Sequence, residues 1–111
     1  MHEFGLCEGV LQAVQNRAGG RRVARIRLRC GVRHAVDSAA MTQAFSMLAA
    51  GTEAAGADVE VVAVPATVTC RGCGAASESG DQLAVCPRCG GADVEVSGGD
   101  ELMLESVTYA G

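Results

Sequence analysis

The spacing of apolar side chains predicts a helix at the beginning of the chain. Over residues 3–18 the apolar positions recur every three or four residues, so they share one helical face. These positions are Cys7, Val10, Leu11, Val14 and Ala18. The pair Gly19-Gly20 follows directly, and glycine is the residue that most often ends a helix.

The same periodicity predicts a second helix within residues 36–56. Asp37 or Ser38 is suited to the N-cap, because its side-chain oxygen can accept a hydrogen bond from an unpaired N–H of the first turn. We expect the buried stripe of this helix to consist of Met41, Ala44, Phe45 and Leu48.

Alternation of apolar and charged residues predicts a strand on each side of the second helix. In residues 21–30, one face would carry Ala24, Ile26, Leu28 and Cys30, and the other Arg25, Arg27 and Arg29. The arginine face is expected to be solvated, with docking to an acidic partner as the alternative. The second strand, residues 57–64, stops before Pro65. This strand–helix–strand order favours parallel strands and a right-handed crossover.

The amino-acid composition of the chain changes after Pro65. Residues 66–99 are rich in Cys, Gly and Ser and poor in large apolar side chains, so they cannot hold a packed core alone. Residues 100–109 alternate again and predict a last strand that returns to the first sheet. We therefore predict an α+β fold. A small mixed β-sheet packed with two helices, residues 1–65 and 100–111, is interrupted by an inserted zinc-ribbon-like domain, residues 66–99, with two CxxC knuckles.

Composition narrows the class of protein. The chain has 111 residues, a formal net charge of -4 and only 3% aromatic residues. Nucleic-acid binders are more often basic and use aromatic side chains for stacking, so the sequence argues against that partner. No apolar stretch approaches the ~18 residues of a membrane span, and no signal peptide is evident. We expect a cytoplasmic protein with reduced thiols, and no catalytic constellation that would make it an enzyme.

Two CxxC motifs indicate a metal site. Their cysteines are Cys70, Cys73, Cys86 and Cys89, with 12 residues between the pairs. Four thiolates suit tetrahedral Zn²⁺, and a complete cysteine shell leaves no open position for catalysis. Gly74 and Gly90, which follow the pairs, can adopt a positive φ, and Arg71 and Arg88 can offset the negative charge of the cluster. A thioredoxin-like redox pair and an iron site remain alternatives.

A second candidate metal site lies at the start of the chain, in the sequence "MHE" at residues 1–3. The Met1 amine, the amides of His2 and Glu3, and the His2 imidazole can close adjacent small chelate rings. Deprotonated amides with imidazole favour a square-planar site, which suits Ni²⁺ or Cu²⁺ and not Zn²⁺. The first N–H groups of a helix have no intrahelical partner, so they are available. From the residues alone, a histidine at a frayed end with no role remains the simpler interpretation.

Several motifs together resemble the HypA/HybF family of nickel metallochaperones. They are "MHE", "LCEGVLQAV", "RLRCG", the "AF" of the second helix, "CRGC" and "CPRCG", and their order covers essentially the whole chain. The resemblance implies Ni²⁺ carried by Met1, His2 and Glu3, and structural Zn²⁺ held by the two CxxC pairs. It also implies a HypB-type GTPase and the [NiFe]-hydrogenase large subunit as partners, and in some organisms urease maturation proteins.

The sequence departs from some relatives of that family, which carry histidines beside the zinc cysteines. Residues 70–90 contain no histidine, so we expect an all-cysteine shell without histidine exchange. His34 is expected to be a solvated loop residue, with a role as an extra nickel ligand as the alternative. Cys7 and Cys30 are expected to be inert core thiols. The alternative function is a zinc-ribbon module that binds nucleic acid or protein.

Overall fold

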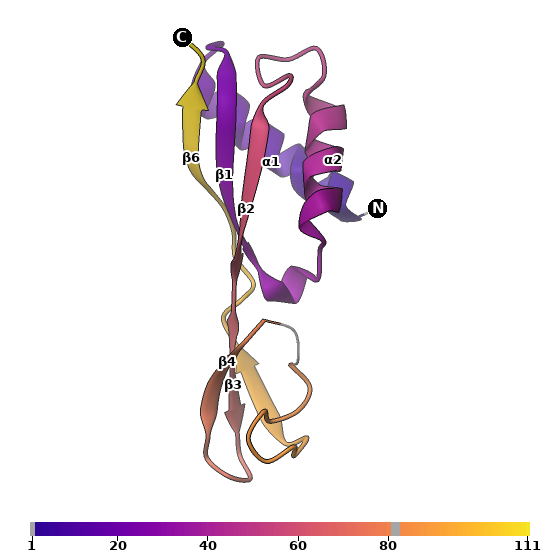
Figure 1. The fold of residues 1–111 in the computed structure, drawn as a ribbon, viewed down its shortest axis with the longest axis vertical. Helices are drawn as coiled ribbons and strands as arrows, with labels where there is room; N and C mark the ends of the chain where they lie inside the picture. Colours follow the sequence, from indigo (N-terminus) through magenta and orange to yellow (C-terminus); the bar gives the residue numbers. More distant parts are fainter. Residues whose placement is uncertain (1, 81–82) are drawn as a thin grey trace. The chain divides into compact units, whose positions relative to one another are not determined.

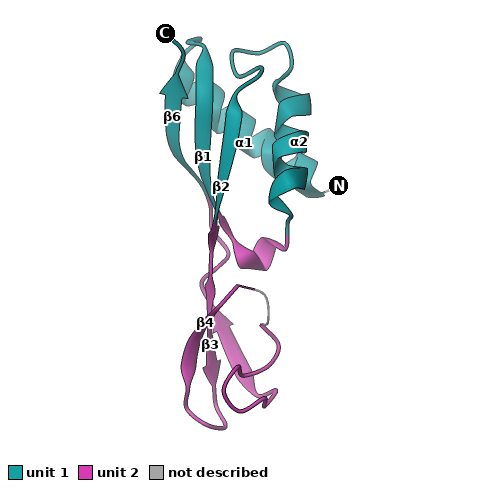
Figure 2. Ribbon diagram, in the orientation of Figure 1, with its two compact units in different colours: residues 1–29, 36–62, 103–111 teal, residues 30–35, 63–102 magenta. Residues whose placement is uncertain are grey.

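The computed structural model describes residues 2–80 and 83–111 of the chain. The elements are α1 (His2–Ala18), β1 (Val23–Gly31), the 3-10 turn η1 (Val32–His34), α2 (Ser38–Ala49), β2 (Asp58–Val64), β3 (Ala66–Cys70), β4 (Ala76–Ser79), β5 (Val94–Ser97) and β6 (Leu102–Tyr109) (Figure 1). They form two compact units (Figure 2). The first unit comprises residues 1–29, 36–62 and 103–111, and the second comprises residues 30–35 and 63–102. No helix within the described ranges is long and apolar enough to cross a membrane.

The first unit is built on a sheet with strand order β2-β1-β6. Figure 1 shows β1 and β2 running in the same direction and β6 running against them, as the pattern predicts. The Ala110 N–H donates to the Arg22 carbonyl oxygen at 2.9 Å, where the end of β6 meets the start of β1. The expected return of the last strand to the first sheet is thus confirmed.

Helices α1 and α2 pack against each other and supply most of the first unit's core. The predicted α1 face is confirmed at Cys7, Val10, Val14 and Ala18, whereas Leu11 is only half-buried. In α2, Met41, Ala44 and Phe45 are buried as predicted. Leu48 is half-buried and Ala49 is buried instead, because Ala49 lies one turn beyond the fully buried Phe45. Asp37 is the N-cap, and its Oδ2 accepts from the Ala40 N–H at 3.2 Å.

The buried face of β1 differs from the prediction at one end. Ile26, Leu28 and Cys30 are buried, but Ala24 is exposed and Val23 is buried in its place. The Val23 N–H donates to the Glu53 carbonyl oxygen at 2.9 Å, so the chain between α2 and β2 covers the first residue of the strand. Regular alternation of buried and exposed side chains begins only at Ile26.

The arginine face of β1 is exposed, and its charges are paired across the sheet. Arg27 Nε lies 2.8 Å from Glu105 Oε2 on β6 and 3.8 Å from Glu60 Oε1 on β2. Arg29 Nη1 lies 3.6 Å from Glu105 Oε1. These carboxylates belong to the two strands that flank β1, so cross-strand pairing accounts for both arginines without an acidic partner.

The second unit contains a sheet with strand order β4-β3-β5, in which β3 pairs antiparallel with both neighbours. Its buried apolar side chains are small, and Val68 of β3 is the largest among those with essentially no exposure. Residues 30–35 also belong to this unit. The Gly31 N–H donates to the Glu101 carbonyl oxygen at 2.7 Å, and the Arg33 N–H donates to the Gly99 carbonyl oxygen at 2.8 Å. The sequence pattern assigned that segment to the first domain, residues 1–65 and 100–111, and the division of the chain into a nickel-binding and a zinc-binding domain stays a prediction.

Candidate metal centres

The cysteines of the two CxxC motifs meet in the second unit. Their four Sγ atoms all lie within 4.8 Å of one another. Cys70 ends β3, and the β3–β4 turn brings Cys73 beside it. Cys70 and Cys86 are buried, whereas Cys73 and Cys89 are exposed. Two cross-loop contacts of 3.7 Å join the sulfurs of Cys70 and Cys89 and those of Cys73 and Cys86.

These distances fit a tetrahedral zinc shell. With a Zn–S bond of about 2.3 Å, two sulfurs of a regular tetrahedron are ~3.8 Å apart. Both cross-loop contacts are within about 0.1 Å of that separation. The four thiols are free, and no disulfide competes for them. The donor set and its spacing therefore suit Zn²⁺, with all four positions supplied by the chain.

Backbone N–H groups point at the cysteine sulfurs and alter their acidity. The N–H groups of Cys89 and Arg88 donate to Cys86 Sγ at 3.5 and 3.4 Å, and they lower the pKa of Cys86 to about 6 from 9.0. The Gly91 N–H lowers the pKa of Cys89, but the other three thiols raise it more, to about 11. The Cys86 thiol is thus ionised at neutral pH before any metal binds, and the Cys89 thiol is not.

The predicted knuckle glycines are confirmed, because Gly74 has φ 77° and Gly90 has φ 75°. Each N–H closes its turn on the first cysteine of the motif, with Gly74 donating to the Cys70 carbonyl at 2.9 Å and Gly90 to the Cys86 carbonyl at 2.8 Å. A side chain at either position would be strained at this φ.

The predicted role of Arg71 in offsetting the cluster charge is wrong. Its Nη1 lies 2.9 Å from Asp93 Oδ1 and its Nη2 lies 3.3 Å from Glu95 Oε2, so two carboxylates already neutralise it. The register that pairs Cys70 with Val94 brings Arg71 beside Asp93. Sequence reasoning missed both carboxylates, and only the alternating "VEV" of β5 hinted at the strand that positions them.

The other candidate residues, His2 and Glu3, form the first turn of α1 in the first unit. His2 Nδ1 lies 3.9 Å from Glu3 Oε2, and the side chains are 57% and 22% exposed. The Glu3 carboxylate accepts from its own backbone N–H, which lowers its pKa; burial opposes this and the nearby His2 adds to it. Met1, the third predicted nickel ligand, lies outside the described residues.

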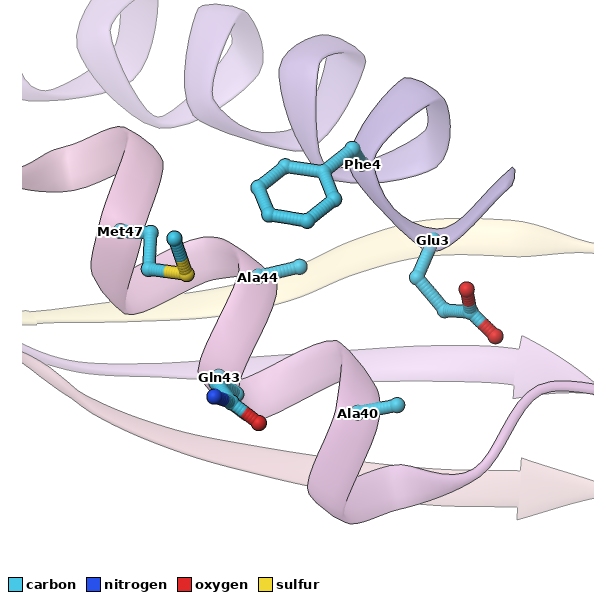
Figure 3. A pocket seen from close by; sticks show the side chains of 6 residues that line it. All are labelled: Glu3, Phe4, Ala40, Gln43, Ala44 and Met47. Atoms are coloured by element: carbon cyan, nitrogen blue, oxygen red, sulfur yellow. The ribbon is translucent and has the colours of Figure 1, made fainter. Parts of the chain in front are cut away.

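An apolar hollow of about 230 Å³ borders this turn. Figure 3 shows the Phe4 ring and the Met47 side chain on opposite sides of it, with the Glu3 carboxylate at one edge. Ala40, Gln43 and Ala44 of α2 complete the lining. Met47 is 61% exposed, which is unusual for a large apolar side chain. Glu3, one of the candidate nickel ligands, thus lies beside an open apolar surface.

The remaining histidine and cysteines have structural partners. His34 Nε2 lies 2.9 Å from the Asp100 carbonyl oxygen, so the tautomer with a proton on Nε2 donates to it. His34 belongs to the second unit and not to the unit that contains His2. Cys7 is fully buried, and its Sγ lies 3.4 Å from the Met41 carbonyl oxygen. Cys30 is 4% exposed, and burial raises the pKa of its thiol.

Comparison with known proteins identifies the family. A family model described as "Hydrogenase/urease nickel incorporation, metallochaperone, hypA" matches residues 1–109. The chain belongs to the HypA family. It is 36% identical over 110 residues to the hydrogenase maturation factor HypA of Rhodobacter capsulatus, covering 96% of this chain and 97% of that protein. It is 34% identical over 110 residues to HypA of Acidithiobacillus ferrooxidans, with the same coverage.

Solved structures of HypA proteins share the fold. The solution structure of the Ni metallochaperone HypA from Helicobacter pylori aligns with a TM-score of 0.62 at 18% identity, covering 96% of each chain. A second solution structure of a HypA protein aligns with a TM-score of 0.61 at 19% identity, covering 99% of this chain and 97% of that one. The predicted α+β fold class is therefore confirmed. As a member of the HypA family, the chain is a nickel-incorporation metallochaperone and not an enzyme.

Proposed function

We propose that this HypA-family chain binds Ni²⁺ at its N-terminus and delivers it, with a HypB-type GTPase, to the [NiFe]-hydrogenase large subunit. The observation that carries the proposal is the family match from residue 1, which includes His2 and Glu3 where they open α1. The proposed nickel ligands are Met1, His2 and Glu3. The half-exposed imidazole of His2 can be reached by a recipient without unfolding the helix.

The start of α1 supports reversible nickel binding. The first backbone N–H groups of a helix have no intrahelical acceptor, so the Glu3 amide can lose its proton to a metal without breaking the helix. Loss of this proton would release the hydrogen bond that the amide donates to its own carboxylate. The lowered pKa of that carboxylate keeps a negative charge beside the cation. Nickel binding and release then require only a local change in the first turn.

The four cysteines of the second unit are proposed to hold one structural Zn²⁺. The cross-loop sulfur contacts at 3.7 Å and the full cysteine donor set support this assignment. The bound ion supplies cross-linking between the two CxxC turns, and the chain supplies every ligand. Nickel, in contrast, is cargo that must leave.

The proposed setting is the cytoplasm, where the reduced cysteines remain available for metal. The family description names both hydrogenase and urease nickel incorporation, so urease maturation proteins are proposed as further partners. The alternative, a zinc-ribbon module for nucleic acid or protein, gains no support from the second unit, because Arg71 is already paired with carboxylates.

Acetylating the amino group of Met1 tests the nickel site. Acetylation keeps every side chain but removes the terminal amine as a metal ligand, so the chelate ring between that amine and the His2 amide can no longer close. We expect nickel binding, measured by isothermal titration calorimetry, to collapse while zinc content stays unchanged.

His2→Ala is expected to behave in the same way, and His34→Ala serves as the matched control with normal nickel affinity. Nickel affinity unchanged by acetylation would remove the N-terminal chelate from the proposal. Loss of nickel binding in the His34 variant alone would move the site to the second unit.

A further inference from the structure

The cysteine cluster has one open side. Its exposed members, Cys73 and Cys89, line a hollow of about 330 Å³ together with Gly74, Ala75 and Arg88. The other two cysteines are buried. A small solute can therefore reach only one member of each CxxC pair from solvent, and it meets the positive charge of Arg88 beside them.

We propose that this hollow is an entry site for peroxide, which oxidises the cluster to cross-loop disulfides and releases its metal. The inference rests on the zinc site proposed above. Thiolates that are exposed and lie near a cation are the most readily oxidised cysteines in proteins. Cys7 and Cys30 lack that exposure and are spared.

The reaction balances with hydrogen peroxide as the oxidant. The exposed Cys73 thiolate attacks one peroxide oxygen, an S–O bond forms, the O–O bond breaks and hydroxide leaves. The nearby Cys86 thiolate then attacks the sulfenic sulfur, an S–S bond forms, the S–O bond breaks and a second hydroxide leaves. Two electrons pass from the two sulfurs to one peroxide. The Cys89 and Cys70 pair reacts in the same way with a second peroxide.

The sulfur contacts determine which disulfides form. Each 3.7 Å contact joins an exposed sulfur to a buried one on the other loop, so the resolving thiol is in place for both exposed cysteines. A disulfide has a sulfur separation of about 2.05 Å, so each pair closes by only ~1.7 Å. Disulfide sulfurs are poor zinc ligands because the thiolate is the ligand form. Oxidation of one pair therefore leaves too few thiolates to retain the ion.

The test uses the full chain purified with zinc, with metal content measured first. Hydrogen peroxide is then added while zinc release is followed with a chromogenic chelator, and disulfides are mapped by mass spectrometry. We expect release of the bound zinc, disulfides Cys73–Cys86 and Cys70–Cys89, and reduced Cys7 and Cys30. Disulfides within each CxxC motif, or zinc retained with all thiols unmodified, would overturn the proposal.

The starting metal analysis separates the two hypotheses. Absence of zinc from the purified chain contradicts the zinc assignment, whereas the disulfide map still tests the pairing in the metal-free protein. Arg88→Gln tests the hollow as the route, and we expect a severalfold slower release. Arg71→Gln is the matched control from the other CxxC loop, because its charge is held by Asp93 and Glu95. Equal release rates in the parent and the Arg88 variant would exclude the hollow as the entry site.

Discussion

In the first unit, Phe45, Ile26 and Leu28 are fully buried between two helices and a sheet. In the described part of the second unit, the largest buried side chain is Val68, and two of its other buried groups are the cysteines Cys70 and Cys86 of the proposed zinc site. Each large apolar side chain that is fully buried contributes roughly 1.5–3 kcal/mol. The first unit can therefore be stabilised by apolar burial, whereas strands of four or five residues with small side chains cannot.

On the proposed assignment, the two units of one short chain support two kinds of metal chemistry. Zinc in a complete cysteine shell contributes roughly 10–16 kcal/mol in small zinc-folded peptides, enough to replace a core. The candidate nickel ligands His2 and Glu3 lie instead at the first turn of α1, on a unit with its own buried apolar core. We therefore expect removal of nickel to leave the carrier folded and removal of zinc to unfold the second unit.

The largest expected effect comes from breaking the cysteine shell. In Cys86→Ser, we expect zinc to be lost and strands β3, β4 and β5 to lose ordered structure, because little apolar burial remains to hold them. Amide signals in a two-dimensional NMR spectrum report each unit separately, and metal analysis gives the zinc content. Cys7→Ser is the matched control, since Cys7 is also buried but lies in the first unit. An ordered second unit without zinc would contradict the proposal that zinc, and not apolar burial, stabilises this unit.

Phe45→Ala is the reciprocal test in the first unit. Removing this fully buried ring should lower the free energy of unfolding by about 3–5 kcal/mol, while zinc content stays unchanged. Urea unfolding followed by signals from the first unit measures the loss. Phe4→Ala is the control, with a smaller expected loss because Phe4 is only half-buried. Loss of zinc at the same urea concentration as unfolding of the first unit would show that the units are one cooperative system.

The difference between the units also explains what the sequence could predict. Long periodic segments predicted α1, α2 and β1, and the alternating residues 100–109 predicted the return of β6 to the first sheet. The predictions were wrong at the ends of elements. At the start of β1, Val23 is buried where Ala24 was expected, because the chain near Glu53 covers the first residue of the strand. Such coverage comes from a distant segment and has no local signal.

In the second unit, ligand spacing was more informative than hydrophobic pattern. The CxxC spacing predicted the convergence of four sulfurs and the positive φ of Gly74 and Gly90. It did not predict β3, β4 and β5, because strands of four or five residues carry little periodicity. The pairing of Arg71 with Asp93 and Glu95 depends on the register of β3 and β5, which is a tertiary property.

A smaller effect is expected in the pH dependence of zinc binding, which distinguishes the sulfurs of the second unit. Protons compete with zinc for each thiolate. The pKa of Cys86 is about 6, so this thiol is already ionised at pH values between about 7 and 8. Zinc binding there should release no more than three protons from the four cysteines, and the fourth should be released only below about pH 6. Calorimetry in buffers of different ionisation enthalpy counts these protons. Release of four protons at neutral pH would contradict the ionised Cys86.

The smallest effect is expected on the exposed sheet face of the first unit. Arg27→Ala removes ion pairs with Glu105 and Glu60, but the Arg27 side chain is 45% exposed. Exposed pairs contribute about 0.2–1 kcal/mol, so urea unfolding should show a loss no larger than this. The loss should shrink in about 1 M salt, which screens charges beyond ~3 Å. Arg71→Ala is the counterpart in the second unit, where we expect an equally small loss with zinc bound, because its ion pairs with Asp93 and Glu95 are also exposed. A loss well above about 1 kcal/mol in either variant would mean that its ion pairs contribute more to the fold than their exposure indicates.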